Sequence, residues 1–238
     1  MPAYFASDIH LRLDRPDRAE RFARFVAGLD SADSLTIGGD LCDFWYAARQ
    51  RRADPLTCEG LRALAEFRGR GGELTILPGN HDVWLGPLYE AALGARFVPE
   101  PLERVVHGVR VHLVHGHQVG ARPWWKAVME SRTFLQGFEA LPGPLARRLE
   151  TVLNQTNNRK LDTAERRHAV VFQRYAEGLA GTADLCLFGH VHRPIDVTGP
   201  ALRWIVLGGW QERSSFVKVD DRGVEFVIEG PRPKPLHW

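Results

Sequence analysis

The sequence predicts an α/β fold with a layered core, because short strand-like runs alternate with segments of helical periodicity. In the first third of the chain the strand-like runs cover residues 4–6, 35–37 and 74–77. Helical patterns over residues 16–29 and 56–68 separate these runs. Such an alternation is typical of a sheet that is covered by helices.

The two predicted helices each carry an apolar stripe, and a stripe at helical spacing packs on a core. The stripes consist of Phe22, Phe25, Val26 and Leu29 in the first helix and of Leu61, Leu64, Ala65 and Phe67 in the second. Gly71 and Gly72 end the second pattern. Later strand-like runs cover residues 111–114, 185–188, 204–207, 216–219 and 224–228.

Residues from about 120 to 181 show helical patterns only, between one set of predicted strands and the next. A chain of 238 residues is long enough for one large domain and needs no second core. We therefore predict a single domain over residues 1–238, with a helical lid inserted at about 120–181.

The composition is that of a folded globular protein, with 44% hydrophobic and 25% charged residues. No run approaches the roughly 18 apolar residues of a membrane span, and no secretory signal precedes the first strand. We expect a cytoplasmic protein that at most touches a membrane surface. The net charge of +2 gives no reason to expect nucleic acid as a partner. The three widely spaced cysteines, Cys42, Cys58 and Cys186, predict reduced structural thiols.

Side chains that can bind metal follow one predicted strand after another. The strand ends are followed by Asp8 and His10, by Asp40, by Asn80 and His81, by His115, and by His190 and His192. Strand ends on one edge of an open sheet converge on a shared crevice, so residues far apart in sequence can meet there. Any one of these residues alone would more often be a cap or a turn residue. Five clusters in order predict a metal site.

The donors in these clusters are carboxylates, an amide and imidazoles. This mixture suits Mn²⁺, Fe²⁺ or Zn²⁺ better than Ca²⁺, which prefers oxygen ligands. The number of donors predicts two divalent ions, and we expect Mn²⁺ with Fe²⁺ and Zn²⁺ as alternatives.

The motifs D-x-H, G-D, G-N-H-D, H-G and G-H-x-H occur in this order between residues 8 and 192. In this the sequence resembles the calcineurin-like metallophosphoesterase superfamily. The resemblance implies a four-layer α-β-β-α sandwich and a dinuclear centre that activates water for in-line attack on phosphorus. The site residues that it implies are Asp8, His10 and His192 at one ion, Asn80, His115 and His190 at the other, Asp40 as the bridge, and His81 as the catalytic acid or orienting residue.

Neighbouring polar residues leave alternatives open. Asp43 and Asp82 could hold ligand histidines by hydrogen bonds or could cap turns. His117 could face substrate or solvent. His168 has no matching context, so we expect it to be structural or exposed.

The residues around the motifs are more specific than the motifs themselves. They form the runs SDIHL at 7–11, GGDLCDFW at 38–45, GHVHRP at 189–194 and LGGW at 207–210. These runs resemble the UDP-2,3-diacylglucosamine pyrophosphatase (hydrolase) family of lipid A biosynthesis. The chain departs from that family's pattern at His81, where the family has Arg, and at His117, where it has Asp.

The predicted lid is basic and rich in apolar residues. Residues 118–180 hold ten basic and six acidic side chains, a net charge of +4. Trp124 and Trp125 could receive acyl chains while cations engage a diphosphate, or the apolar residues could simply pack the lid's own helices. Further substrate contacts are predicted at Arg122 and Arg193, whose guanidinium groups match phosphate oxygens, and by the family resemblance at Asn157, Arg159 and Lys160.

The leading hypothesis is therefore a two-metal hydrolase that releases UMP and 2,3-diacylglucosamine 1-phosphate from a UDP-linked lipid precursor, with peripheral contact to the inner membrane through the lid. One alternative is a phosphodiesterase or nucleotide pyrophosphatase with a soluble substrate. A second is a non-catalytic scaffold, against which the complete set of Asp40, Asn80 and His81 argues.

Overall fold

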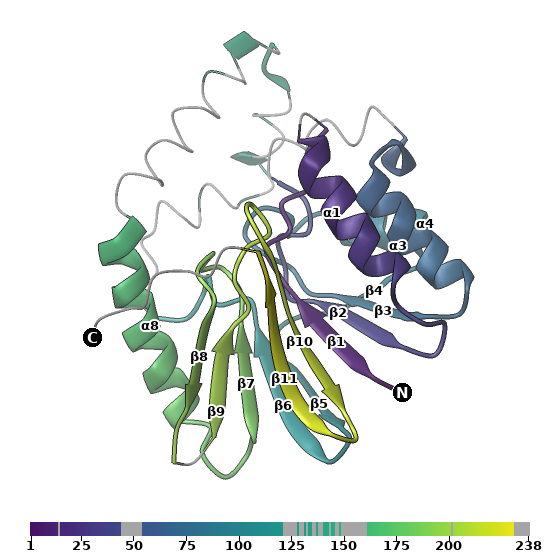
Figure 1. Cartoon of the computed structure of the whole chain (residues 1–238). Helices are drawn as coiled ribbons and strands as arrows, with labels where there is room; N and C mark the ends of the chain where they lie inside the picture. Colours follow the sequence, from purple (N-terminus) through teal and green to yellow (C-terminus); the bar gives the residue numbers. More distant parts are fainter. Residues whose placement is uncertain are drawn as a thin grey trace.

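Two β-sheets lie face to face, with helices on the outer side of each (Figure 1). The computed structural model describes residues 1–13, 15–43, 54–120, 161–200 and 202–230, together with scattered positions between 128 and 148. The four-layer α-β-β-α sandwich that the sequence predicts is confirmed in these ranges.

The first sheet is mixed. In spatial order its strands are β11 (Gly223–Glu229), β10 (Ser214–Asp220), β1 (Ala3–Ala6), β2 (Ser34–Ile37), β3 (Glu73–Ile76) and β4 (Arg96–Phe97). Strands β1 to β4 run parallel, with Ala6 opposite Ile37 and Ile37 opposite Ile76. The carboxyl ends of these strands therefore lie level at one edge.

The second sheet has five strands. In spatial order they are β5 (Leu102–Val106), β6 (Val109–Val114), β7 (Leu185–Phe188), β9 (Arg203–Val206) and β8 (Ile195–Thr198). Strands β6, β7 and β9 are parallel, with Val114 opposite Phe188 and Phe188 opposite Val206. Their carboxyl ends also lie level.

Alternate residues of both sheets face each other and form the core between them. This core holds Phe5 and Val217 from the first sheet and Leu113, Leu187 and Ile205 from the second, all fully buried. The packing fixes the position of one sheet on the other, since protein interiors are close-packed.

The outer face of the first sheet is covered by α1 (Pro16–Ala27), α3 (Glu59–Gly69) and α4 (Gly86–Leu93), with a 3₁₀ turn at Pro55–Thr57 before α3. Helix α1 begins with Pro16, whose missing N–H costs nothing at that position, and has Asp17 in its first turn. Its stripe residues Phe22 and Val26 are fully buried in the core beneath it, as the periodicity predicts.

Helix α8 (Leu161–Glu177) covers the outer face of the second sheet, on the left in Figure 1. Phe172 stacks on Phe188 of β7, with ring centroids 4.3 Å apart and planes at 4°. Ala169 and Ala176 are buried in the same core. The later part of the predicted lid thus packs as the fourth layer, and the extent of the insertion stays a prediction.

Four elements have no counterpart in the sequence-based expectation: α4, β4, β5 and β8. Helix α4 has only eight residues and β4 only two, too few for a periodicity to show. All three cysteines are buried and free, as expected. Among the described residues, no helix is long and apolar enough to cross a membrane.

Replacing Phe172 by Ala should lower the free energy of unfolding by about 3–5 kcal/mol, because it removes a buried ring from a close-packed layer. Urea unfolding measures the change. Val170→Ala is the matched control, since this helix neighbour is 42% exposed and its loss should cost under about 0.5 kcal/mol. Equal effects of the two substitutions would contradict the assignment of α8 to the fourth layer.

Candidate metal centre

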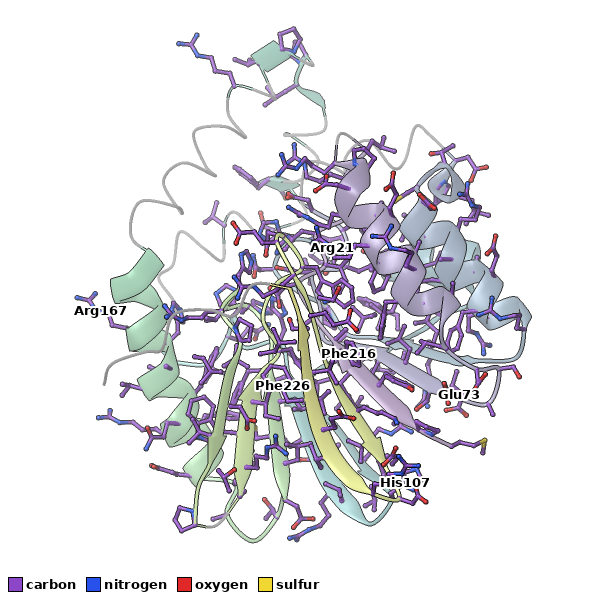
Figure 2. All side chains as sticks on the ribbon, viewed as in Figure 1. Arg21, Glu73, His107, Arg167, Phe216 and Phe226 are labelled. Carbon is purple, nitrogen blue, oxygen red and sulfur yellow. The ribbon has the colours of Figure 1, made fainter. Side chains whose placement is uncertain are left out.

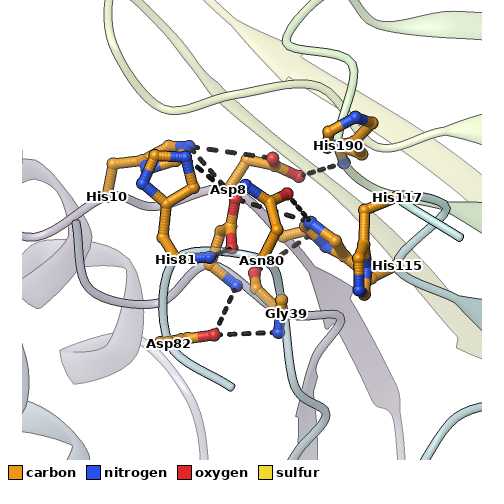
Figure 3. A network of polar contacts seen from close by, with 12 residues as sticks. Asp8, His10, Gly39, Asn80, His81, Asp82, His115, His117 and His190 are labelled. Carbon is orange, nitrogen blue, oxygen red and sulfur yellow. Dashed lines mark hydrogen bonds and ion pairs between the residues drawn. The ribbon is translucent and has the colours of Figure 1, made fainter. Parts of the chain in front are cut away.

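The loops that carry the predicted ligands meet where the carboxyl ends of both sheets lie side by side (Figure 3). Backbone hydrogen bonds join the loops: the N–H groups of Asp8 and His10 donate to the carbonyls of Gly39 and Asp40, and Gly189 donates to His115. We call this group of loops the metal edge.

Four of the predicted ligands have a left-handed backbone. Their φ angles are 55° for Asp8, 51° for His10, 53° for Asp40 and 65° for His190. Residues other than glycine rarely adopt this conformation, which costs of order 1–3 kcal/mol each and persists mainly where function requires it. The sequence did not predict this feature, which marks the same residues independently.

The first group of donor atoms comprises Asp8, His10 and His192. Asp8 Oδ1 lies 3.8 Å from His10 Nε2 and 3.6 Å from His192 Nε2, and the two imidazole nitrogens lie 3.0 Å apart. The structure therefore brings these three predicted ligands together.

Asp40 lies between this first group of donor atoms and His115. Its Oδ2 atom is 3.7 Å from His10 Nε2 and 3.4 Å from His115 Nε2. The Nδ1–H of His115 donates to the carbonyl of Gly38 at 2.8 Å, which turns Nε2 toward Asp40 and toward Asn80 Oδ1, 3.2 Å away. A carboxylate in this position can serve both groups.

Of the predicted histidine and aspartate ligands, His190 lies outside the groups of donor atoms found among the described residues. Its backbone N–H donates to Asp8 Oδ2 at 2.9 Å, and its ring centroid is 5.5 Å from that of His115. Figure 3 shows the imidazole directed away from the Asp8 carboxylate.

The donor atoms fit divalent cations. Three overlapping groups of carboxylate and imidazole atoms lie within 4.8 Å of one another: Asp8, His10 and His192; His10, Asp40 and His81; and Asp8, Asp40 and His115. Asp8 Oδ1 and His10 Nδ1 are buried and accept or donate no hydrogen bond within the described part of the chain. Buried polar atoms without such partners are costly, and a cation would satisfy a buried carboxylate oxygen.

The electrostatics of the metal edge keep both carboxylates ionised. Burial alone would raise the pKa of Asp40, but the imidazoles of His115, His81 and His10 outweigh it, so that this pKa lies well below its usual range. The pKa of Asp8 is lowered in the same way, chiefly by His10. Conversely, burial would lower the pKa of His115, but Asp40 raises it to about 10.

His81 belongs to the donor group of His10 and Asp40, and it also lies beside Asp43. Its backbone N–H donates to Asp40 Oδ1 at 2.8 Å, its Nε2 is 3.9 Å from Asp40 Oδ2, and its Nδ1 is 3.6 Å from Asp43 Oδ1. Burial would lower the pKa of His81, yet Asp40 and Asp43 raise it to about 9. In the metal-free protein the ring is therefore protonated at neutral pH.

Asp82 holds the loops and contacts no predicted ligand side chain by a hydrogen bond in the described structure. It accepts hydrogen bonds from the backbone N–H groups of Asp40, Leu41 and Gly79 and from the hydroxyl of Tyr89. Of the two roles open to Asp82, turn capping is the one observed.

Gly79 permits the close approach of two loops. A Cβ atom here would overlap the Asp40 carboxylate and its backbone nitrogen. Only glycine therefore lets the loop after β3 pass beside Asp40.

Two residues that support the metal edge, Glu100 and Gln211, were missed from sequence. Glu100 accepts a hydrogen bond from the backbone N–H of His115 at 2.7 Å, and the side-chain amide of Gln211 is hydrogen-bonded to His192 Nδ1 at 3.0 Å. The ring of His168, on α8, lies 5.5 Å from that of His190. No motif marks Glu100 or Gln211, because a lone polar residue in a loop has no pattern.

The predicted substrate contacts are mostly beyond the described residues. Arg193 is half-buried and follows His192 directly at the metal edge. His117 is buried, with its ring 5.2 Å from that of His115, which excludes a solvent-facing role. Outside the described residues lie Arg122, Trp124, Trp125, Asn157, Arg159 and Lys160.

The two-sheet fold and a buried cluster of carboxylates and imidazoles at its edge define a metal-dependent hydrolase. The sequence profile of the calcineurin-like phosphoesterase family matches residues 1–194. The chain belongs to this family, and it is a metallophosphoesterase.

Curated relatives are similar over nearly the whole chain. A protein of Hahella chejuensis is 26% identical over 95% of this chain and 97% of its own length. One of Aeromonas salmonicida is 29% identical over 91% and 89%, and one of Xanthomonas campestris is 28% identical over 94% and 97%. All three relatives carry the name UDP-2,3-diacylglucosamine hydrolase.

Gly79→Ala should lower the affinity for divalent metal by about 10- to 100-fold, the range for a disturbed support of a ligand. The added methyl group displaces Asp40, so calorimetric titration with Mn²⁺ measures the effect. Gly69→Ala is the control, since a Cβ there meets no atom within 4 Å in helix α3. Unchanged affinity in Gly79→Ala would remove Asp40 from the metal site.

Metal uptake at pH 7.5 should release protons, because the His115 imidazole, with a pKa of about 10 in the metal-free protein, is protonated and must lose its proton to bind metal. Calorimetry in two buffers of different ionisation enthalpy counts the protons. The affinity for metal should rise as the pH increases toward 10, because less His115 is then protonated. In the metal-free protein the raised pKa contributes stability that is complete below about pH 6.5 and is lost as pH rises through 10. Uptake without proton release would count against His115 as a ligand.

Proposed function

We propose that this protein is a dinuclear-metal hydrolase that cleaves the diphosphate of UDP-2,3-diacylglucosamine, giving UMP and 2,3-diacylglucosamine 1-phosphate. The position of Asp40 supports a site for two metal ions. Its Oδ2 atom lies within 4 Å of His10 and of His115, which belong to two different donor groups. The substrate rests on the name shared by relatives that match over nearly the whole chain.

The proposed ligands are Asp8, His10 and His192 for one ion and Asn80, His115 and His190 for the other, with Asp40 shared. The ions supply Lewis acidity toward the phosphoryl oxygens and the attacking water when bound. We propose Mn²⁺, with Fe²⁺ and Zn²⁺ as alternatives, because the donors are carboxylate, amide and imidazole groups. His190 would reach its ion through a rotation of its side chain.

His81 is the proposed acid. A protonated imidazole with a pKa of about 9 can donate a proton to the leaving oxygen and stabilise the developing charge. Asp43, 3.6 Å from His81 Nδ1, orients the ring so that Nε2 faces the metal edge. Its exposed fraction of 22% leaves the ring accessible to substrate.

The substrate is proposed to lie along Arg193 and the basic lid, with Arg122, Asn157, Arg159 and Lys160 near the diphosphate and Trp124 and Trp125 near the acyl chains. The apolar lid would also bring the protein to the inner membrane, where such a substrate resides. The apolar lid supports the roles of Trp124 and Trp125, the match of guanidinium to phosphate supports Arg122 and Arg193, and the family resemblance supports Asn157, Arg159 and Lys160.

A second candidate function is hydrolysis of a soluble phosphodiester or nucleotide diphosphate. Two residues favour it: His81 and His117 stand where the UDP-2,3-diacylglucosamine family pattern has Arg and Asp. At both positions the chain has the residue of the general superfamily pattern, and that pattern does not indicate a lipid substrate.

His81→Ala should lower kcat by about 10²- to 10⁴-fold with metal content unchanged, because it removes a proton donor and not a ligand. Metal analysis alongside steady-state kinetics tests this. Asp43→Asn should have a smaller effect on kcat and should move the basic limb of the pH profile to lower pH, since Asp43 helps to raise the pKa of His81. Loss of metal in His81→Ala would reassign this residue as a ligand.

The substrate is tested by a metal-supplemented panel of UDP-2,3-diacylglucosamine, UDP-N-acetylglucosamine, a cyclic nucleotide and p-nitrophenyl phosphodiesters. We expect kcat/KM for the acylated sugar to be at least about tenfold higher, since each buried methylene contributes about 0.8 kcal/mol. Trp124→Ser and Trp125→Ser should remove this preference and leave the small phosphodiester unaffected. Val128→Ser, at a lid position that is 50% exposed, is the matched control. Absence of a preference for the acylated sugar would make the soluble substrate the better proposal.

A further inference from the structure

A cavity of about 540 Å³ lies on the outer face of the first sheet, between α1 and β10. We call it the α1–β10 groove. Its apolar wall consists of Tyr4, Phe25, Leu29 and Phe216. Figure 2 labels Arg21 and Phe216, which lie on this side of the molecule. The volume is within the range of pockets that hold small molecules.

The wall of the groove is aromatic and partly open. The ring centroids of Phe25 and Phe216 are 4.6 Å apart, and that of Tyr4 is 6.1 Å from each. Tyr4 and Phe25 are only half-buried, so their ring surfaces remain available to a ligand. Such a surface suits an apolar or aromatic body.

Three guanidinium groups line the same groove, those of Arg21, Arg24 and Arg213. Two carboxylates, of Glu212 and Glu229, also line it, which leaves one positive charge in excess. The Glu212 side chain is 76% exposed and lies 3.5 Å from Arg213 Nη2, so it screens Arg213 weakly.

Arg213 is the group that points most directly to a ligand. Its side chain is only 14% exposed, and its Nη1 atom is buried without a hydrogen-bond partner among the described residues. A buried donor without a partner is costly, and a guanidinium group binds carboxylate or phosphate by paired hydrogen bonds.

The groove is connected to the metal edge by the loop between β9 and β10, residues 207–213. Arg21 Nη1 donates to the carbonyls of Trp210 and Gln211, at 2.8 and 3.3 Å. In the same loop the Gln211 side-chain amide is hydrogen-bonded to His192 Nδ1, and the Gly209 N–H donates to the His192 carbonyl. An anion that attracts Arg21 or Arg213 therefore acts on the loop that orients His192.

We propose that the α1–β10 groove is an effector site for a small amphiphilic anion, with one carboxylate or phosphate on an apolar body, whose binding changes the metal affinity of the edge. The anion pairs with Arg213 and Arg24 while its apolar body covers Tyr4 and Phe25. This proposal is independent of the substrate, because its test measures binding without substrate.

The test is calorimetric titration of the metal-loaded protein with 4-phenylbutyrate, with phenylphosphonate and with the neutral 4-phenylbutanol. The two acids distinguish a carboxylate from a phosphate-like ligand. We expect the better acid to bind at least about tenfold more tightly than the alcohol, since hydrogen bonds to charged groups are the strong ones. Equal binding of acid and alcohol would overturn the anion site.

Variants locate the binding. Arg213→Gln and Arg24→Gln should each weaken the acid at least about fivefold, while Glu212→Gln should leave it bound as well or better. Arg24 is exposed, so its variant remains informative even where Arg213→Gln is unstable. Asp40→Asn controls for anions at the metal edge and should leave groove binding in place. Unchanged affinity in Arg24→Gln together with loss in Asp40→Asn would overturn the proposal.

The coupling has its own measurement. Saturating acid should change the affinity for Mn²⁺ by at least about fivefold, the lower end of usual coupling between sites. Gln211→Ala should abolish this change and leave the acid bound, since it removes the hydrogen bond to His192. An unchanged Mn²⁺ affinity would overturn the effector role.

Discussion

The buried negative charge of Asp40 is the interaction on which the metal edge depends. A carboxylate that is 1% exposed is costly unless other groups compensate its charge. Here the backbone N–H of His81 donates to it, and the imidazoles of His10, His81 and His115 surround it within 4 Å. Since those imidazoles come from separate loops, the charge holds together segments that the sequence keeps far apart.

The two-sheet sandwich brings the loops of the metal edge together. Each sheet brings its parallel strands to the same end, and the core between the sheets sets the two ends side by side. At the metal edge the left-handed backbone turns the chain sharply at Asp8, His10, Asp40 and His190. Strain at these positions is tolerated because the strands behind them are largely buried and the loops are hydrogen-bonded to one another.

Much of this could be predicted from sequence, because strands that alternate with helices and motifs in a fixed order are signals repeated along the chain. Helix α4 is short, but Pro87 at its start and the left-handed Gly94 at its end were available signals. Strand β5 ends in a turn with positive φ at His107 and Gly108. A His-Gly pair is a weak turn signal, so the end of this strand was not predicted. The supporting contacts of Glu100 and Gln211 depend on how loops meet in space, and no local pattern encodes that.

The division of the metal edge between two sheets has a consequence for cooperativity. Asp8, Asp40 and Asn80 follow strands of the first sheet, whereas His115, His190 and His192 follow β6 and β7 of the second. Neither sheet alone holds the full set of proposed ligands, so the proposed ions would bind the assembled sandwich and not a half-folded chain. Ligands that bind only the native state stabilise it by mass action. With the proposed ligands, the free metal concentration would therefore set the free energy of unfolding of this protein as well as its activity.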